Sequence, residues 1–445
     1  MAGSPEITII GGGLAGVEAA WQAVRRGCQV TLYEMKPTTF SPAHESTDLA
    51  ELVCSNSLRA ENPHNAVGLL KEEMRSLDSL IMATAAATRV PAGRALAVDR
   101  KLFSRRITET LEREALITII REEVNTIPPP APGPLIIAAG PLAGAALAKD
   151  LARLIGEEHL AFYDAIAPIV YADSLNMSLI FQASRYDAGQ GDYLNCPFTQ
   201  EQYRDFIRVL KDAPQVPLHD FEEPKYFEGC LPIEIMAARG ENTPRFGPMK
   251  PVGLIDPRTG REPYAVVQLR QENREGMLYN LVGFQTKLTH TAQKEVFRMI
   301  PGLEQVGFAR LGSIHRNTFV CAPKVLHSSL QLRARSDILL AGQISGVEGY
   351  VESSAIGLMA GINAVRLSRG QAGLVPPVDT ALGALIGHLS QTEAAVFQPT
   401  NINFGLFPAL VGKKIPKRLR GEYRARIALE SLAHWQKACP EPAAA

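Results

Sequence analysis

Three glycines near the N-terminus constrain the fold of this chain more than any other feature. Gly11, Gly13 and Gly16 follow an apolar run at residues 7–10, and a helical pattern of apolar residues begins directly after them. In a strand–turn–helix unit, the first glycine permits the turn, the second lets the backbone approach a pyrophosphate, and the third lets helix and strand pack closely. The pyrophosphate would lie at the helix N-terminus. We therefore predict a dinucleotide site that includes Gly11, Gly12, Gly13, Leu14, Ala15 and Gly16.

An acidic residue completes the pattern. The helical pattern ends near Gly27, and residues 29–33 predict a second strand that closes on Glu34. A carboxylate at this place suits the hydroxyl pair of a ribose. A glycine motif alone is weak evidence, but its place between a strand and a helix, with an acid after the next strand, favours a dinucleotide site over an ordinary glycine turn.

Further apolar runs that end in glycine define the fold class. Residues 135–140 and 338–342 repeat the strand pattern, each followed by a helical segment, and residues 68–87 predict one helix. Such alternation is typical of an α/β fold with a doubly wound, mostly parallel sheet. No second glycine motif of this spacing occurs, and the returning strand favours a Rossmann-like FAD-binding domain over a separate NAD domain.

The middle of the chain has a different pattern. From about residue 173 to residue 323 the segments are short and alternating, with turns, isolated prolines and interleaved aromatic and basic residues. We predict a first part of the FAD-binding domain at 1–172, an inserted α+β domain for substrate or RNA at 173–323, and a second part of the FAD-binding domain, with a basic tail, at 324–445.

Composition excludes several classes of protein. Lys plus Arg and Asp plus Glu both number 46, so affinity for a polyanion requires a local basic patch. The six cysteines form no CxxC pair and no Cys/His ligand spacing, which disfavours a metal site and a disulfide framework. The N-terminus lacks a signal-peptide pattern and no run of about twenty apolar residues occurs, so we expect a cytoplasmic protein without a membrane segment. No sequence feature requires a protein partner.

Two cysteines lie in settings that suit a reactive thiol. Cys54 is followed by Ser55, Asn56 and Ser57, which favour turns and exposed backbone. Cys230 comes just before Pro232, a residue suited to the first helical position, where a helix dipole favours thiolate. Most free cysteines are instead small buried hydrophobic residues, and this interpretation stays open for both.

Basic residues gather in two places. Near the C-terminus they are Lys413, Lys414, Lys417, Arg418, Arg420, Arg424 and Arg426. In the predicted insertion, basic and aromatic residues are interleaved, namely Arg239, Arg245, Phe246, Lys250, Arg258, Arg261, Tyr264 and Arg270. A basic run is often only a solvated helix face, but these patterns also suit contacts with phosphates and stacking on unpaired bases.

The chain resembles, over almost its whole length, the folate- and FAD-dependent tRNA (uracil-5-)-methyltransferases, relatives of the flavoproteins that modify the tRNA wobble uridine. The shared segments are IIGGGLAGVEAAW, AELVCSNSL, NAVGLLKEEMR, PAGRALAVDR, YLNCPF, FEGCLPIE, FGPMKPVGLIDPRTG, QLRQEN, LVGFQT, IPGLE, HRNTF, AGQISGVEGYVESSAIGLMAG and NINFGLFP. The wobble-modifying relatives carry a long helical extension after the AGQ segment, and this chain ends about a hundred residues beyond it.

The resemblance implies an enzyme that methylates uracil C5 in the tRNA T-loop. FAD is its cofactor, NADH or NADPH the reductant, and 5,10-methylenetetrahydrofolate the methylene donor. The family's two functional cysteines fall on Cys54 and Cys230, one as nucleophile and the other as proton acceptor, without an assignment of which is which. The second flavin segment falls on Gly342, Gln343 and Gly349.

Three other functions stay open from the sequence. The same chemistry could act on ribosomal RNA, the chain could be a plain FAD-dependent oxidoreductase for a small molecule, or it could be a non-catalytic RNA-binding flavoprotein. The basic tail and the two cysteines favour the methyltransferase over a plain oxidoreductase, which needs neither feature.

Overall fold

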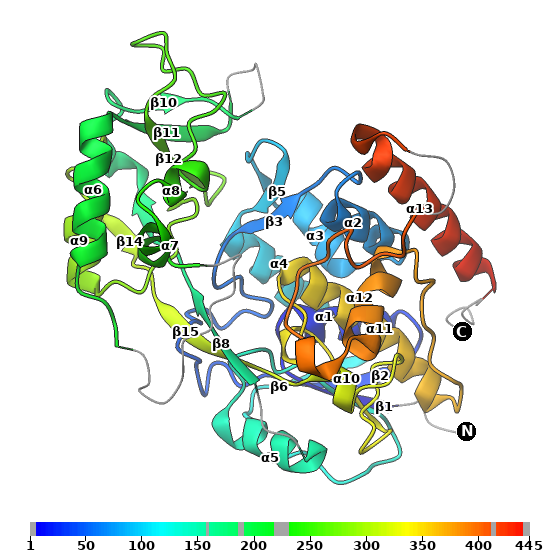
Figure 1. Cartoon of the computed structure of the whole chain (residues 1–445). Coiled ribbons are helices and arrows are strands. Elements are labelled where there is room, and N and C mark those ends of the chain that lie inside the picture. Colours follow the sequence, from blue (N-terminus) through cyan, green and yellow to red (C-terminus); the bar gives the residue numbers. More distant parts are fainter. Residues whose placement is uncertain (1–5, 157–159, 186–190, 218–230, 411–414, 439–445) are drawn as a thin grey trace.

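A five-stranded parallel sheet forms the centre of the larger body of the molecule (Figure 1). The computed structural model describes residues 6–156, 160–185, 191–217, 231–410 and 415–438. The sheet order is β16-β7-β1-β2-β6, and each neighbouring pair is parallel. Its strands are β1 (Glu6–Ile10), β2 (Gln29–Tyr33), β6 (Ile117–Ile120), β7 (Leu135–Ile137) and β16 (Ile338–Leu340). The predicted α/β class with a mostly parallel sheet is therefore confirmed, including the strand that returns after the middle segment.

Two helices distant in sequence pack tightly beside this sheet. They are α1 (Leu14–Val24) and α11 (Tyr350–Ser368). A Cβ at Gly357 would lie 2.2 Å from the carbonyl oxygen of Ala15, and one at Gly361 would lie 2.6 Å from that of Ala19. The two backbones therefore approach so closely that only glycine fits at these positions. Because Gly357 faces Ala15 and Gly361 faces Ala19, the two helices run in the same direction.

The prediction of one helix over residues 68–87 is wrong, because the chain forms two. Helix α2 (Ala66–Ser76) ends before Asp78, whose backbone is left-handed at φ 56°, and α3 (Leu80–Ala87) begins after it. Ser79 caps α3 through its side chain, and the buried carboxylate of Glu18 on α1 accepts hydrogen bonds from the Ser79 hydroxyl at 2.7 Å and from the N–H of Ile81 at 3.0 Å. A long-range cap therefore fixes the break.

The other elements of the larger body surround the parallel sheet. A three-stranded sheet has the order β3-β5-β4. The remaining bounds are β3 (Ser57–Ala60), β4 (Arg89–Val90), β5 (Ala95–Val98), α4 (Arg100–Glu112), α5 (Ala145–Ile155), α10 (Ala322–Val325), α12 (Ala381–Gln391) and α13 (Arg420–Ala438), with short 3₁₀ turns at η3 (Gln343–Ser345), η4 (Ala394–Val396) and η5 (Lys417–Leu419).

A six-stranded antiparallel sheet forms the second body, drawn mainly in green in Figure 1. It has its own apolar core, which includes Tyr203, Phe206 and Phe284. Its strands in sheet order are β10 (Phe181–Gln182), β11 (Tyr193–Phe198), β12 (Ala265–Gln271), β13 (Leu278–Leu281), β9 (Ile169–Tyr171) and β14 (Phe308–Arg310). Its helices are α6 (Gln200–Asp212), α7 (Ile233–Arg239), α8 (Thr243–Phe246) and α9 (His290–Phe297), and a 3₁₀ turn, η1 (Ala172–Ser174), follows β9.

A long antiparallel strand pair connects the two bodies. It consists of β8 (Leu160–Ala165) and β15 (Ile314–Phe319), which run between them in Figure 1. The strand pair carries the chain into the antiparallel sheet and back to the parallel one. Among the helices of the described ranges, none has the length and apolar character needed to cross a membrane.

Candidate active site

The three glycines of the turn differ in what surrounds them. A Cβ at Gly11 would lie 2.5 Å from the carbonyl oxygen of Ala138, and one at Gly16 would lie 1.8 Å from that of Gly11. A Cβ at Gly13, by contrast, would meet no atom within 4 Å. Protein packing therefore requires Gly11 and Gly16, whereas Gly13 keeps space open for something outside the chain.

Two helix N-termini beside this space lack a side-chain cap. Gly13 precedes α1 and Gly349 precedes α11, and in the part of the chain that the structure describes neither helix has a side-chain hydrogen bond at its N-cap. Unsatisfied N–H groups and the positive end of the helix dipole favour an anion. The donors fit the pyrophosphate of FAD, with the backbone of Gly11, Gly12 and Gly13 as its cradle.

Most of the predicted cofactor residues line one cavity. Gly342 contributes a positive φ of 78° where the chain passes close to Ala15. Gly16 does not line the cavity because it packs inside the turn, and Gly349 lines the neighbouring cavity described below. The predicted residues that line the cavity are Gly11, Gly12, Gly13, Leu14, Ala15, Glu34, Gly342 and Gln343.

Glu34 is fixed by the backbone on both sides of the turn. One carboxylate oxygen accepts a hydrogen bond from Gly12 N–H at 2.8 Å, and the other accepts one from Lys36 N–H at 3.0 Å. The side chain is buried but still lines the cavity. This carboxylate is therefore held rigidly at the end of β2, where a ribose would be bound.

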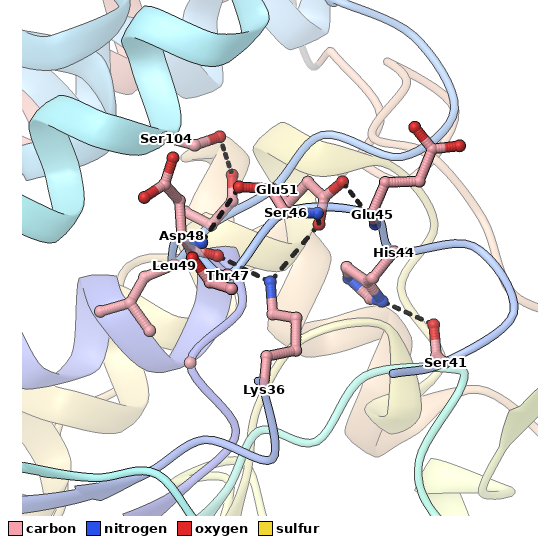
Figure 2. A network of polar contacts seen from close by, with 12 residues as sticks. Lys36, Ser41, His44, Glu45, Ser46, Thr47, Asp48, Leu49, Glu51 and Ser104 are labelled. Atoms are coloured by element: carbon pink, nitrogen blue, oxygen red, sulfur yellow. Dashed lines mark hydrogen bonds and ion pairs between the residues drawn. The ribbon is translucent and has the colours of Figure 1, made fainter. Parts of the chain in front are cut away.

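A buried ion pair holds the loop that follows β2 (Figure 2). The Lys36 ammonium donates to the carbonyl oxygen of Asp48 at 2.6 Å and lies 3.5 Å from the Glu51 carboxylate. Glu51 also accepts hydrogen bonds from the N–H groups of Glu45 at 3.0 Å and Ser46 at 3.1 Å. Lys36 and Glu51 line the same cavity. The sequence analysis missed both, since a lone lysine in a polar loop carries no signal.

His44 lies in this loop and lines the cavity too. Its Nδ1 is 2.6 Å from the hydroxyl oxygen of Ser41 (Figure 2). Burial, followed by the charge of Lys36, lowers the pKa of His44 from 6.5 to about 4. The imidazole is therefore neutral at pH 7.

Cys54 lines a second cavity with a volume of about 410 Å³, directly beside the first. Val53, Gln343 and Tyr350 line both cavities, so the two spaces adjoin at these residues. The loop between β2 and β3 contributes Cys54 to the one and His44 to the other. The cavity is larger than one pyrimidine base requires.

The backbone around Cys54 is held by groups from three other parts of the chain. The Tyr350 hydroxyl oxygen accepts hydrogen bonds from the N–H groups of Cys54 at 2.7 Å and Ser55 at 3.2 Å. Arg100 donates to the carbonyl oxygen of Leu52 at 2.6 Å, and Arg310 donates to that of Val53 at 2.9 Å. Arg100 is close enough to Cys54 for the two groups to interact electrostatically. The Arg100 guanidinium also pairs with the Glu272 carboxylate at 3.1 Å, so it reaches this loop as one partner of an ion pair.

Arg270 belongs to this support and not to an exposed basic surface. Its side chain is buried and donates to Asn56 Oδ1 at 2.9 Å and Ser55 Oγ at 2.8 Å. Asn56 in turn donates to the carbonyl oxygen of Val98 at 3.0 Å and that of Gln271 at 2.9 Å. The second body thus contributes to the position of the Cys54 loop through β12.

Two carboxylates line the Cys54 cavity as well. They are Asp164 at the end of β8 and Glu348 just before α11. Burial and the charge of Asp164 raise the pKa of Glu348 well above its ordinary value, and Gln343 donates to it at 2.7 Å. Burial therefore favours the protonated form of the Glu348 side chain, a tendency that the sequence does not reveal.

The predicted residue Cys230 lies outside the described residues. Helix α7 begins after it at Ile233, one position later than expected, with Pro232 as N-cap. The N–H of Ile233 donates to the carbonyl oxygen of Gln285 at 2.8 Å, and Gln285 lines the Cys54 cavity. The start of α7 is therefore next to this cavity.

The basic tail is described in part. Lys413 and Lys414 lie outside the described residues, whereas Lys417, Arg418 and Arg420 are exposed at η5 and the start of α13. The remaining two cations have partners within the tail region: the Arg424 guanidinium lies 5.7 Å from the Phe404 ring and 5.5 Å from the Phe407 ring, and Arg426 pairs with Glu430.

Comparison with known proteins places this geometry in a family. The family model described as "Glucose inhibited division protein A" matches residues 6–372. A protein of Desulfotalea psychrophila is 60% identical over 97% of both chains, and one of Geobacter sulfurreducens is 60% identical over 96% of this chain and 98% of its own. Both carry the name methylenetetrahydrofolate–tRNA-(uracil-5-)-methyltransferase TrmFO.

A solved structure has the same fold. Aquifex aeolicus GidA in its form I crystal superposes with a TM-score of 0.69 over 96% of this chain and 76% of that chain, at 17% identity. At this identity the likeness concerns the fold alone.

Proposed function

The chain belongs to the glucose inhibited division protein A family, and from this premise we propose that it methylates C5 of uracil in tRNA with 5,10-methylenetetrahydrofolate as the carbon donor and FAD as its cofactor. The relatives that carry this activity in their names match almost the full length of the chain at about 60% identity. We further propose that the target is the T-loop uridine at position 54, which becomes ribothymidine.

The adjoining cavities are the observation that carries the proposal. One cavity holds the glycine turn, Glu34 and Gly342, and the other holds Cys54. A flavin oxidoreductase for a small molecule needs the first cavity and has no use for a supported cysteine in a second one. A methyltransferase needs both, because the base must lie beside the source of electrons.

The chemistry explains the need for a thiol. Uracil C5 is a poor nucleophile until a thiolate forms a bond to C6, which moves the C5–C6 π electrons toward C4 and leaves negative charge on O4. C5 can then bond to the methylene carbon as one carbon–nitrogen bond of the donor breaks, with its electrons passing to nitrogen. When a base removes the C5 proton, the second carbon–nitrogen bond breaks and leaves an exocyclic methylene group, and the thiolate leaves C6 as a hydride reduces that group. We assign these two tasks to Cys54 and Cys230 together, without deciding which cysteine performs which.

The residues around the cavities have supporting tasks in this scheme. Tyr350 and Arg100 hold the Cys54 loop in place. Glu348 lies in the same cavity as Cys54, and burial favours its protonated form, which can donate a hydrogen bond to an oxygen that gains negative charge. Bound flavin, in the reduced form that NADH or NADPH regenerates, would supply the hydride that converts the methylene to a methyl group.

Two further parts of the function are proposed from the family pattern. NADH or NADPH would return the flavin to its reduced form, and residues 173–323 would form a domain that receives the RNA. We place the protein in the cytoplasm, because its tRNA substrate is found there.

Incubation with an unmodified tRNA transcript tests the proposal. The reaction contains 5,10-methylenetetrahydrofolate, FAD and either NADH or NADPH, and nucleosides from the digested RNA are separated by mass. We expect 5-methyluridine at position 54 only when folate and reductant are both present. A parallel ribosomal RNA substrate is the control, and methylation of that RNA alone would contradict the tRNA assignment.

A further inference from the structure

The structure separates the basic and aromatic residues of the second body into different roles. Arg270 is buried against the Cys54 loop, and Arg258 is paired with Asp256 at 2.7 Å. Phe246, in contrast, is 75% exposed, the highest value for any large apolar side chain in the described ranges. A phenylalanine that is this accessible contributes little to the core, so its place at the surface needs another reason.

Phe246 stands at the outer end of a series of contacts that joins two tyrosine rings, packed edge to face, and one arginine. The buried ring of Tyr203 lies 5.4 Å from that of Tyr264, centroid to centroid. The Arg245 guanidinium lies 4.2 Å from the Tyr264 ring centroid and 5.9 Å from that of Phe246. Arg245 also donates to the carbonyl oxygen of Tyr264 at 2.7 Å. These contacts therefore reach from the core to the surface and end in an exposed aromatic ring.

The backbone under Phe246 is fixed by hydrogen bonds. The N–H of Phe246 donates to the carbonyl oxygen of Asn242 at 3.2 Å, and the N–H of Gly247 donates to that of Thr243 at 3.1 Å. The N–H of Met249 donates to the carbonyl oxygen of Pro244 at 2.9 Å, and the carbonyl oxygen of Met249 accepts a hydrogen bond from the N–H of Val266 at 3.0 Å. The second bond attaches the turn to β12. A ring on such a support loses little conformational entropy when a flat ligand stacks on it.

The turn also contacts the wall of the Cys54 cavity. Pro248 packs so closely on Gly283 that a Cβ there would lie 2.4 Å from the Pro248 Cβ. Gly283 lines the Cys54 cavity. In Figure 1, α8 lies on the side of the second body on which β3 and β5 are drawn. Phe246 is thus two residues away in sequence from Pro248, which contacts the cavity wall.

We propose that Phe246 is a stacking platform for an unpaired base of the RNA substrate, next to the base that enters the Cys54 cavity; this inference rests on the proposed function. A uracil in a folded RNA must leave its stack to reach a thiol in a cavity, and leaving costs a few kcal/mol. An aromatic ring at the surface replaces the lost stacking for a neighbouring base.

The charge of the segment favours RNA over a protein partner. Residues 239–264 contain five basic residues (Arg239, Arg245, Lys250, Arg258 and Arg261) and three acidic ones (Glu241, Asp256 and Glu262), a net charge of +2 in a chain whose total is 0. A polyanion with flat bases matches both the charge and the ring.

Three variants test the platform. Phe246→Ala removes the ring, Phe246→Trp keeps an aromatic face, and Met177→Ala, which shortens a side chain that is 53% exposed, is the matched control. The dissociation constant for the unmodified tRNA transcript is measured together with flavin content and the melting temperature. We expect Phe246→Ala to raise the dissociation constant about 5- to 100-fold, Phe246→Trp to restore it, and Met177→Ala to leave it unchanged.

Other outcomes separate this inference from the proposed function. If the wild-type protein forms 5-methyluridine and Phe246→Ala binds tRNA as tightly as the wild type, the platform is refuted and the function stands. If the wild-type protein makes no 5-methyluridine but Phe246→Ala still weakens tRNA binding, the function fails and the platform stands. If Phe246→Ala changes the oligomeric state and leaves the tRNA affinity unchanged, the ring contacts another protein chain and the platform is refuted.

Discussion

The hydroxyl oxygen of Tyr350 accepts a hydrogen bond from the backbone N–H of Cys54 at 2.7 Å, although the two residues are 296 positions apart. Tyr350 is also the first residue of α11 and lines both the cavity of the glycine turn and the cavity of Cys54. One side chain therefore couples the position of the cysteine to the helix that begins between the two cavities. Burial and the nearby Cys54 raise the pKa of Tyr350, so the phenol is neutral at pH 7.

Tyr350→Phe should impair catalysis more than folding. The change leaves the N–H groups of Cys54 and Ser55 without their acceptor, and an unsatisfied buried donor costs about 1–3 kcal/mol. We expect the Cys54 loop to shift, kcat for 5-methyluridine formation to fall about 10- to 100-fold, and flavin content to stay normal. Tyr171→Phe, at an exposed tyrosine, is the control. Wild-type kcat in Tyr350→Phe would show that the hydrogen bond does not position the thiol.

Gly13→Leu should abolish FAD binding without unfolding the protein. The backbone at Gly13 has φ −76° and ψ −174°, which any residue adopts, and its Cβ would meet no protein atom. The leucine side chain would instead occupy the pyrophosphate space. Absorbance at the flavin band and the melting temperature of the apoprotein are the measurements.

Gly16→Leu is the contrasting variant. A Cβ there would overlap the carbonyl oxygen of Gly11 at 1.8 Å, so we expect loss of folded protein and not selective loss of FAD. Full flavin content in Gly13→Leu would place the pyrophosphate elsewhere.

Local patterns predicted the parts of this site that are continuous in sequence. The spacing of Gly11, Gly13 and Gly16 and the place of Glu34 after a strand sufficed to predict the strand–turn–helix unit, because Gly11 and Gly16 answer local packing demands. The role of Gly13 toward a cofactor stays a prediction. The break between α2 and α3 was not predicted, although Ser79 supplies a local N-cap; the additional hydrogen bonds from Glu18 on another helix have no local sequence signal. Likewise, no local pattern shows that Tyr350 contacts Cys54.

Side-chain environment was the other property that the sequence did not reveal. Arg270 and Phe246 occur in the same kind of basic and aromatic pattern, yet one is 7% exposed and the other 75%. Only the tertiary structure separates an arginine that supports the Cys54 loop from an aromatic ring that faces solvent. The boundaries at residues 173 and 323, and the roles of the individual site residues, stay predictions.

The lowered pKa of His44 should reduce the free energy of unfolding in mild acid. Its pKa is about 4 in the folded state and 6.5 as the ordinary value, so below pH 6.5 only the unfolded chain binds the proton. Its contribution to stability is complete above pH 6.5 and is lost as the pH falls toward 4. At pH 5 the loss is about 2 kcal/mol.

Urea unfolding at pH 7 and pH 5 measures this effect. We expect His44→Gln to lose less stability between these pH values than the wild type, while His434→Gln, at an exposed histidine, follows the wild type. Equal losses for His44→Gln and the wild type would contradict a buried neutral imidazole.

Neutralising the described part of the basic tail should weaken tRNA binding. Lys417, Arg418 and Arg420 are exposed, and a triple alanine variant removes three charges that can contact phosphates. We expect the slope of log affinity against log salt concentration to become shallower by about two to three. The control removes three exposed charges on α4 and α5, namely Lys101, Arg113 and Arg153. An unchanged slope in the tail variant, or the same change in the control, would show that the tail is only a solvated helix face and does not bind RNA specifically.

Loss of either cysteine tests the central claim most directly. Cys54→Ala, Cys230→Ala and Cys196→Ala are compared with the wild type for 5-methyluridine formation in unmodified tRNA, with flavin content and tRNA binding measured on the same preparations. Cys196 is the control because it is buried in the core of the second body, where burial raises the pKa of its thiol. The account predicts that Cys54→Ala and Cys230→Ala keep FAD and tRNA binding but lose at least about a hundredfold in turnover, whereas Cys196→Ala keeps its turnover. Near-normal turnover in Cys54→Ala would contradict the account.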